Sequence, residues 1–222
     1  MFQLGISAAC AYVRKSLDEL TSVEDIGMVD SPDAMDLHKI VEESIVEAAV
    51  RVHERASSLM MEGKTATAGT HYKATADTKE KTIINIVFQT NSETVRIVSL
   101  KASDSSYVIT ELIPEDSAEG RKQLDANVRG TYDDPRAVLL KKWANDNCPE
   151  IRYYSAEKES PTPTFTIEYV PYPTINDDTI EVCPRLEYAV LNELTAMVMD
   201  SLGLHERAAF HREKANNIME GK

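Results

Sequence analysis

The stretch CPRLEYAVLNELTAMVMDSLGLHERAAFHREKANNIM, residues 183–219, decides the architecture of this 222-residue chain. Pro184 stands where a helix accepts proline, because the first helical position needs no amide hydrogen bond. Apolar residues then recur at helical spacing until Gly203 interrupts them, and a second helix is expected over 204–219. The stretch therefore predicts a C-terminal helical hairpin over 184–219. The first helix of the hairpin carries the apolar residues Leu186, Val190, Leu191, Leu194, Val198 and Met199.

The N-terminal part of the chain predicts helices that could pack with this hairpin. Residues 5–20 have apolar residues at helical spacing. Ser31-Pro32-Asp33 is a strong helix start, with a hydroxyl cap, a proline at the first position and an acid near the positive end of the dipole. We expect a long amphipathic helix over 31–61. Its apolar stripe would be Leu37, Val41, Ile45, Ala48, Val52, Ala56 and Leu59.

Gly63-Lys64-Thr65 has the residues that end a nucleotide-binding P-loop. A P-loop needs the order strand, glycine loop and helix, so that loop amides and a helix N-terminus face the phosphates. Here a helix comes first and a strand is expected after it, and Ser58 stands where the motif needs its first glycine. The same Met-Glu-Gly-Lys sequence closes the chain at 219–222. We interpret both copies as helix stops.

The middle of the chain predicts strands. Residues 63–115 contain four segments rich in β-branched and aromatic residues, separated by short polar turns, which indicates an antiparallel meander. Residues 116–182 predict a short helix over 116–127 and then strands at 136–143, 150–155 and 165–173. The fold class is therefore α+β. A helical body from 1–62 and 183–222 would carry a meander insertion at 63–115 and a mixed β and loop region at 116–182.

The composition of the chain excludes several classes of protein. Lys and Arg total 24 against 37 Asp and Glu, a formal net charge of −13 that offers no basic footprint for nucleic acid. No apolar run approaches the roughly 18 residues of a membrane-spanning helix, and no basic leader precedes Arg14, so we expect assembly in a cytosol. The cysteines Cys10, Cys148 and Cys183 lie far apart, which favours reduced structural thiols.

Catalytic motifs are missing from the sequence. His53 and His205 each precede a glutamate, but a zinc helix needs a second histidine four residues after the first, and neither has one. We interpret these two residues and His211 as surface or interface histidines. Asp133-Asp134 and Asp177-Asp178 could in principle bind a divalent cation, yet each pair fits better as a turn. We expect a non-enzymatic protein with no metal and no cofactor.

The order of features over residues 127–220 resembles the head-to-tail adaptor, or neck ring, proteins of tailed bacteriophages of the short-tailed and crAss-like types. Asn127, Gly130 and Thr131 lead to Pro135, then to the strand FTIEYVPYP and to the helical hairpin. In that family the final helix pair carries Leu-Gly followed by Glu, Arg and Ala. Those residues here are Leu202, Gly203, Glu206, Arg207, Ala208 and Ala209. The resemblance covers under half of the chain, and the β-rich segment 64–113 has no counterpart in it.

The resemblance implies an architectural role in the neck of a virion, after assembly in the host cytoplasm. The protein would form a ring, typically of about twelve copies, that closes by cyclic symmetry. The ring would lie between the portal protein and other neck or tail proteins, and DNA would pass through its lumen without specific binding. Aromatic residues of the late strands and the C-terminal hairpin would supply interfaces. The candidate interface residues are Tyr169, Tyr172, His205, Arg207, Phe210, His211 and Arg212.

Two other classes of protein stay open from the sequence. A different phage or bacterial interaction module, such as a tail component, a scaffold or a chaperone, would have the same lack of catalytic motifs. An enzyme of a class without a recognisable motif is the third possibility. Its candidate residues would be His53, His205 and the paired aspartates.

Overall fold

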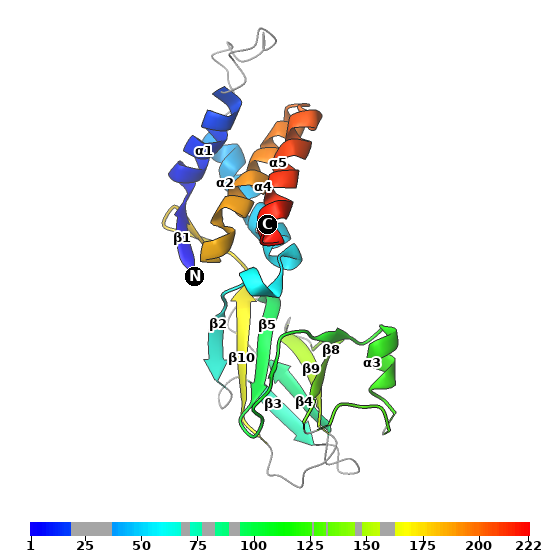
Figure 1. The fold of residues 1–222 in the computed structure, drawn as a ribbon. Helices are drawn as coiled ribbons and strands as arrows, with labels where there is room; N and C mark the ends of the chain where they lie inside the picture. Colours follow the sequence, from blue (N-terminus) through cyan, green and yellow to red (C-terminus); the bar gives the residue numbers. More distant parts are fainter. Residues whose placement is uncertain are drawn as a thin grey trace. The chain divides into compact units, whose positions relative to one another are not determined.

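A computed structural model describes residues 1–18, 37–67, 72–76, 83–88, 94–125, 127–131, 133–144, 148–155 and 163–222. The chain forms two compact units. The helical unit consists of Met1–Glu62 with Pro173–Lys222, and the β unit is Gly63–Tyr172. Helices and strands both contribute, so the predicted α+β class is confirmed (Figure 1).

The helical unit is built around one central helix, α4. This helix runs from Glu187 to Ser201 and has buried residues on all sides, because α1, α2 and α5 all pack against it. The predicted C-terminal hairpin is confirmed as α4 and α5. The other elements of the unit are β1 (Phe2–Gly5), α1 (Ile6–Asp18), α2 (Leu37–Arg55), the 3-10 turn η1 (Ser58–Met60), β11 (Ile175–Asn176), β12 (Thr179–Val182), the 3-10 turn η2 (Pro184–Leu186) and α5 (His205–Met219).

Glycine ends both helices of the hairpin. Gly203 has a φ of 77° and follows α4 by two residues, and Gly221 has a φ of 73° after α5. The amide of Leu204 donates to the carbonyl of Met199 at 2.9 Å, and that of Lys222 donates to Asn217 at 2.9 Å. This is the hydrogen-bond pattern of a left-handed glycine cap. The predicted interruption at residue 203 is therefore a tight turn between two helices.

Replacing Gly203 with alanine should lower the free energy of unfolding by about 1 kcal/mol, because a Cβ makes the left-handed conformation costly. A Cβ at this position would meet no atom within 4 Å, so steric overlap should add nothing. Chemical denaturation followed by helical circular dichroism measures the change. An unchanged midpoint would mean that the turn can adopt another conformation at no cost.

Helix α2 is shorter at its C-terminal end than the sequence predicts. Residues 31–36, with the predicted start, lie outside the described residues. The helix ends at Arg55 instead of residue 61, because the Ser57 hydroxyl accepts a hydrogen bond from the amide of Leu59 and starts η1. Leu59, assigned to the apolar stripe, is consequently 82% exposed. Gly63 therefore does not end this helix.

A three-stranded antiparallel sheet in the order β1-β12-β11 joins the start of the chain to the segment before the hairpin. Strands β11 and β12 are linked by Asp177 and Asp178, with φ values of 47° and 62°. Two consecutive residues of positive φ form the turn that suits a short β-hairpin, and aspartate tolerates this conformation. These aspartates are turn residues, as the sequence predicts. The carbonyl of Asp178 also accepts from the Ile6 amide at the start of α1 at 2.9 Å.

The β unit contains two sheets that combine early and late strands. One has the order β2-β10-β5-β6, and the other has the order β3-β4-β9-β8-β7. The predicted meander over 63–115 is wrong, because β4 pairs with β9 and β5 pairs with β10. The elements are β2 (Lys64–Thr67), β3 (Tyr72–Ala76), β4 (Ile83–Phe88), β5 (Thr94–Ala102), β6 (Val108–Ile109), β7 (Ile113–Pro114), α3 (Ala118–Lys122), β8 (Arg136–Ala144), β9 (Cys148–Tyr154) and β10 (Phe165–Pro171).

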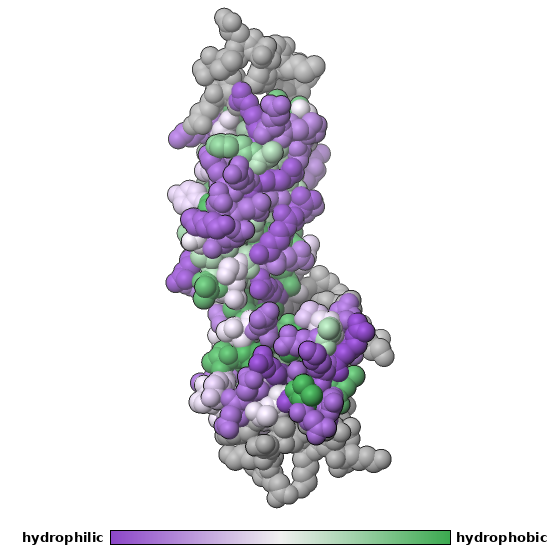
Figure 2. All heavy atoms as spheres, turned by 45° about the vertical axis from the view of Figure 1, so that its right-hand side comes forward, coloured by the Kyte–Doolittle hydropathy of each residue, from purple (hydrophilic) through white to green (hydrophobic). Residues whose placement is uncertain are grey.

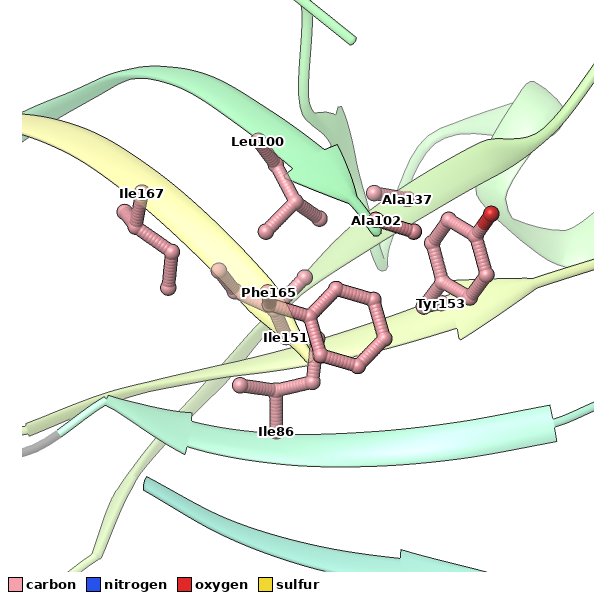
Figure 3. Packing of buried hydrophobic residues seen from close by; sticks show 8 residues of the cluster. All are labelled: Ile86, Leu100, Ala102, Ala137, Ile151, Tyr153, Phe165 and Ile167. Atoms are coloured by element: carbon pink, nitrogen blue, oxygen red, sulfur yellow. The ribbon is translucent and has the colours of Figure 1, made fainter. Parts of the chain in front are cut away.

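The core of the β unit joins its two sheets. Strands β5 and β10 of one sheet and strands β4, β8 and β9 of the other contribute buried side chains to a single cluster (Figure 3). Its members are Ile86, Leu100, Ala102, Ala137, Ile151, Tyr153, Phe165 and Ile167. The segments that the sequence separates at residue 115 therefore share one hydrophobic core, which explains why Gly63–Tyr172 is compact as a whole.

Candidate interface on the helical unit

The predicted interface residues fall in both units. Tyr169 and Tyr172 belong to the β unit. Tyr169 is half-buried on β10 and packs against the core cluster of that unit, whereas Tyr172 follows the strand and is 39% exposed. The other five residues, His205, Arg207, Phe210, His211 and Arg212, all belong to α5. The structure thus collects most of the predicted surface on one helix.

His211 does not lie on the surface, in contrast to the prediction. It is 8% exposed, and its Nδ1 lies 2.9 Å from Oδ1 of Asn192 on α4. Ala208, Ala215 and Met219 are buried on the same side of α5. Because His211 follows Ala208 by three residues and precedes Ala215 by four, this spacing marks it as a residue of the packed side. Its hydrogen bond fixes how α5 lies against α4.

His205 and Arg212 hold the turn of the hairpin. Nδ1 of His205 lies 3.0 Å from Oδ1 of Asp200, and the Arg212 guanidinium donates to the other oxygen of the same carboxylate. The hydrogen bond from His205 and that from Arg212 keep the pKa of Asp200 below its ordinary value. Both predicted interface residues therefore contact their own chain, although the His205 side chain remains largely exposed.

The exposed side of α5 carries a short stripe of two cations and one aromatic ring, Arg207, Phe210 and Lys214, which we call the basic stripe. Phe210 is 54% exposed, and Nζ of Lys214 lies 4.3 Å from the centre of its ring. A cation at this distance interacts favourably with the face of an aromatic ring. The basic stripe is therefore an ordered surface feature of a strongly acidic chain. Arg207 and Phe210 are among the interface residues expected from the sequence, and Lys214 is not.

His53 is buried, so its interpretation as a surface or interface residue is wrong. It is 0% exposed, and its Nε2 accepts a hydrogen bond from the amide of Cys183 at 3.2 Å. Loss of hydration lowers the pKa of His53 from 6.5 to about 4, because burial disfavours the charged imidazolium. The ring is neutral at physiological pH and links α2 to the start of η2.

Glu193 is a buried carboxylate that is not among the candidate residues expected from the sequence. It is 1% exposed at the centre of α4, and its Oε1 lies 3.5 Å from Nη1 of Arg51 on α2. Arg51 also contacts Glu47 one turn earlier, at 2.5 Å. The available signal was the polar group Asn192-Glu193 inside an otherwise apolar helical run. This pair connects α2 to α4 in the middle of the helical unit.

Gly63-Lys64-Thr65 is not a phosphate-binding loop. Lys64 and Thr65 lie in β2, which pairs with β10. The Gly63 amide donates to Oε1 of Glu168 at 3.0 Å, so a carboxylate occupies the place where a phosphate would have to bind. A Cβ at Gly63 would lie 2.6 Å from the carbonyl oxygen of Tyr169. Glycine is needed here for close approach to β10.

The remaining candidate groups of the sequence are possible metal ligands, paired aspartates and cysteines. Within the described ranges, no group of three or more His, Cys, Asp or Glu side chains is arranged to hold a metal ion. Asp134 forms a turn with Thr131 and a 2.8 Å ion pair with Arg136. Cys10 is half-buried, and the buried Cys183 donates from its thiol to the carbonyl oxygen of Glu62 at 3.3 Å. The Cys148 side chain lies outside the described residues. None of the helices in the described part of the chain is long and apolar enough to span a membrane.

No protein-family model matches the chain, and none of the curated proteins matches it significantly.

Proposed function

We propose that this chain is a structural subunit of the neck of a tailed bacteriophage. In this role it forms a ring between the portal protein and the tail, and DNA passes through the lumen of the ring without specific binding. The observation that carries the proposal is the helical unit, in which both chain ends fold together around α4. Its C-terminal hairpin turns at Leu202 and Gly203, two of the residues on which the family resemblance rests.

The chemistry of the described surface agrees with a role in docking. Three of the candidate residues, His205, Arg212 and His53, make hydrogen bonds or ion pairs within their own unit. A net charge of −13 suits a passage from which DNA must slide, since cationic walls would retain phosphates. Exposed aromatic side chains such as Tyr188 and Phe210 are of the kind enriched at protein contacts.

The proposal is tested by electron microscopy of the purified chain, alone and mixed with the portal protein from the same genome. We expect closed rings of one size, formed either by the chain alone or once portal is added. We also expect the protein to be present in purified virions. Small oligomers in solution that are absent from virions would instead favour a scaffold or chaperone. A monomer that never associates with portal would contradict the proposal.

A further inference from the structure

The basic stripe of α5 has a regular spacing. Phe210 follows Arg207 by three residues and precedes Lys214 by four. At about 100° per residue, these intervals place all three on one side of a helix, and all three are exposed. The two cations are about 10 Å apart along the helix axis, at about 1.5 Å per residue, and the aromatic ring lies between them.

Helix α2 carries the same spacing with opposite charge. Glu47, Val50 and Glu54 are also three and four residues apart, and we call them the acidic stripe. Glu47 and Glu54 are exposed and Val50 is half-buried. The acidic stripe therefore repeats the arrangement of the basic stripe, with a carboxylate in place of each cation and an apolar side chain in place of the ring.

The two helices run in the same direction within the helical unit. In Figure 1 both α2 and α5 begin at the end of the unit where α4 finishes and run back towards its start. Copies related by rotation about an axis along these helices keep that direction. Helix α5 of one copy can therefore meet α2 of the next copy only in parallel, which is the orientation in which the two spacings coincide.

We infer that neighbouring copies of this chain pair through the basic stripe of α5 and the acidic stripe of α2. In the parallel register Arg207 faces Glu47, Phe210 faces Val50, and Lys214 faces Glu54 of the next copy. The contact is heterologous, so repetition generates a ring when the rotation closes. The inference rests on the proposed ring function and adds to it the two surfaces that build the ring.

The residues beside the stripes fit the same pairing. Glu206 and Glu213 border the basic stripe on one side of α5. Arg51 and Arg55 border the acidic stripe on the opposite side of α2. When two parallel helices face each other, the clockwise flank of one lies beside the counterclockwise flank of the other, so Glu206 and Glu213 come to lie beside Arg51 and Arg55. Glu206 and Glu213 of one copy thus face Arg55 of the next, beside Arg51, which its own Glu47 and Glu193 hold in place. Glu206 and Glu213 also disfavour a nucleic-acid backbone as occupant of the basic stripe.

Figure 2 shows that the surface of the helical unit turned forward in that view is mainly hydrophilic. A contact on such a surface depends on charge complementarity more than on a wide apolar patch. Complementary charges give an interface its register and exclude wrong partners, and like charges brought together weaken it strongly. Reversal of the charges is therefore the direct test of the pairing.

The test compares three charge-reversed variants of the full chain and one control variant by sedimentation velocity, alone and with portal protein. Arg207→Glu/Lys214→Glu and Glu47→Lys/Glu54→Lys should each raise the concentration for half-assembly about a hundredfold, since each places like charges opposite one another. The combination of all four substitutions restores opposite charges and should assemble like the wild type. The exposed pair Arg14→Glu/Lys15→Glu on α1 changes the net charge by the same amount as Arg207→Glu/Lys214→Glu and should leave assembly unchanged.

The outcomes separate the pairing from the ring itself. If the wild type assembles and either charge-reversed pair assembles equally well, the pairing is overturned and the ring stands. Failure of the fourfold variant to recover assembly, with its melting temperature unchanged, also overturns the pairing. If the wild type does not assemble even on portal, the proposed function fails as well. The pairing is supported when both charge-reversed pairs lose assembly and the fourfold variant regains it.

Discussion

Replacing Phe165 with alanine is expected to lower the free energy of unfolding of the β unit by about 3–5 kcal/mol, the usual cost of deleting a fully buried aromatic side chain. Phe165 lies on β10 and is 0% exposed. Its ring forms a T-shaped pair with the ring of Tyr153 on β9, with ring centres 5.1 Å apart. Because these strands belong to different sheets, the substitution would open a cavity at the junction of the two sheets (Figure 3).

Tryptophan fluorescence during chemical denaturation measures this loss. Trp143 is the single tryptophan of the sequence and belongs to the β unit, so its signal follows that unit. The matched control is Thr166→Ala, at the next position of the same strand, where the side chain is exposed. It should change stability by no more than about 0.5 kcal/mol. A loss below about 1 kcal/mol for the Phe165 variant would show that the cluster does not hold the sheets together.

The helices of this protein could be predicted from the sequence because their signals are local. Pro184 and Gly203 bound α4, and apolar residues at intervals of three and four mark its buried side. The end of α2 was predicted too late, because the apolar spacing continues to Leu59. There the Ser57 hydroxyl, which competes for a backbone amide, decides the outcome. The Ser57 amide also donates to the carbonyl of Met219 on α5 at 3.0 Å, so hydrogen bonds of Ser57 override the periodicity.

The strands were predicted but their partners were not. β-Branched and aromatic residues located β5 and β10 individually, and short polar turns suggested that neighbours in sequence pair with each other. Instead β5 pairs with β10 across a long intervening segment. The choice of partner depends on which strand faces share a core. Leu100 of β5 and Phe165 of β10 lie in the same buried cluster, but this contact exists only in the folded chain. Alternation along one strand carries no such information.

The candidate surface was predicted by residue type and only in part by position. Arg207 and Phe210 are exposed on α5. His211 and His53 were misassigned because both are polar residues on the packed side of their helix. Their intervals to buried alanines, Ala208 and Ala215 for His211 and Ala49 and Ala56 for His53, contained the correct assignment.

Acidification from pH 6.5 to about 4 is expected to lower the free energy of unfolding of the helical unit by about 3 kcal/mol through His53. Its pKa is 6.5 when exposed and about 4 in the folded chain, and one pKa unit corresponds to about 1.4 kcal/mol. Between these values the unfolded state binds a proton that the folded state does not. Stability therefore rises with pH across this window and levels off above it.

Denaturation followed by helical circular dichroism at a series of pH values measures the slope, and His53→Gln identifies its source. Glutamine cannot ionise, so this variant should lose the rise between pH 4 and 6.5, whereas His38→Gln, on the exposed side of α2, should keep it. Asp200, whose pKa is also lowered, contributes in the same direction only as the pH falls below its ordinary value of 3.8. The two windows are therefore separable. An unchanged slope in His53→Gln would mean that the buried imidazole is not the group that titrates.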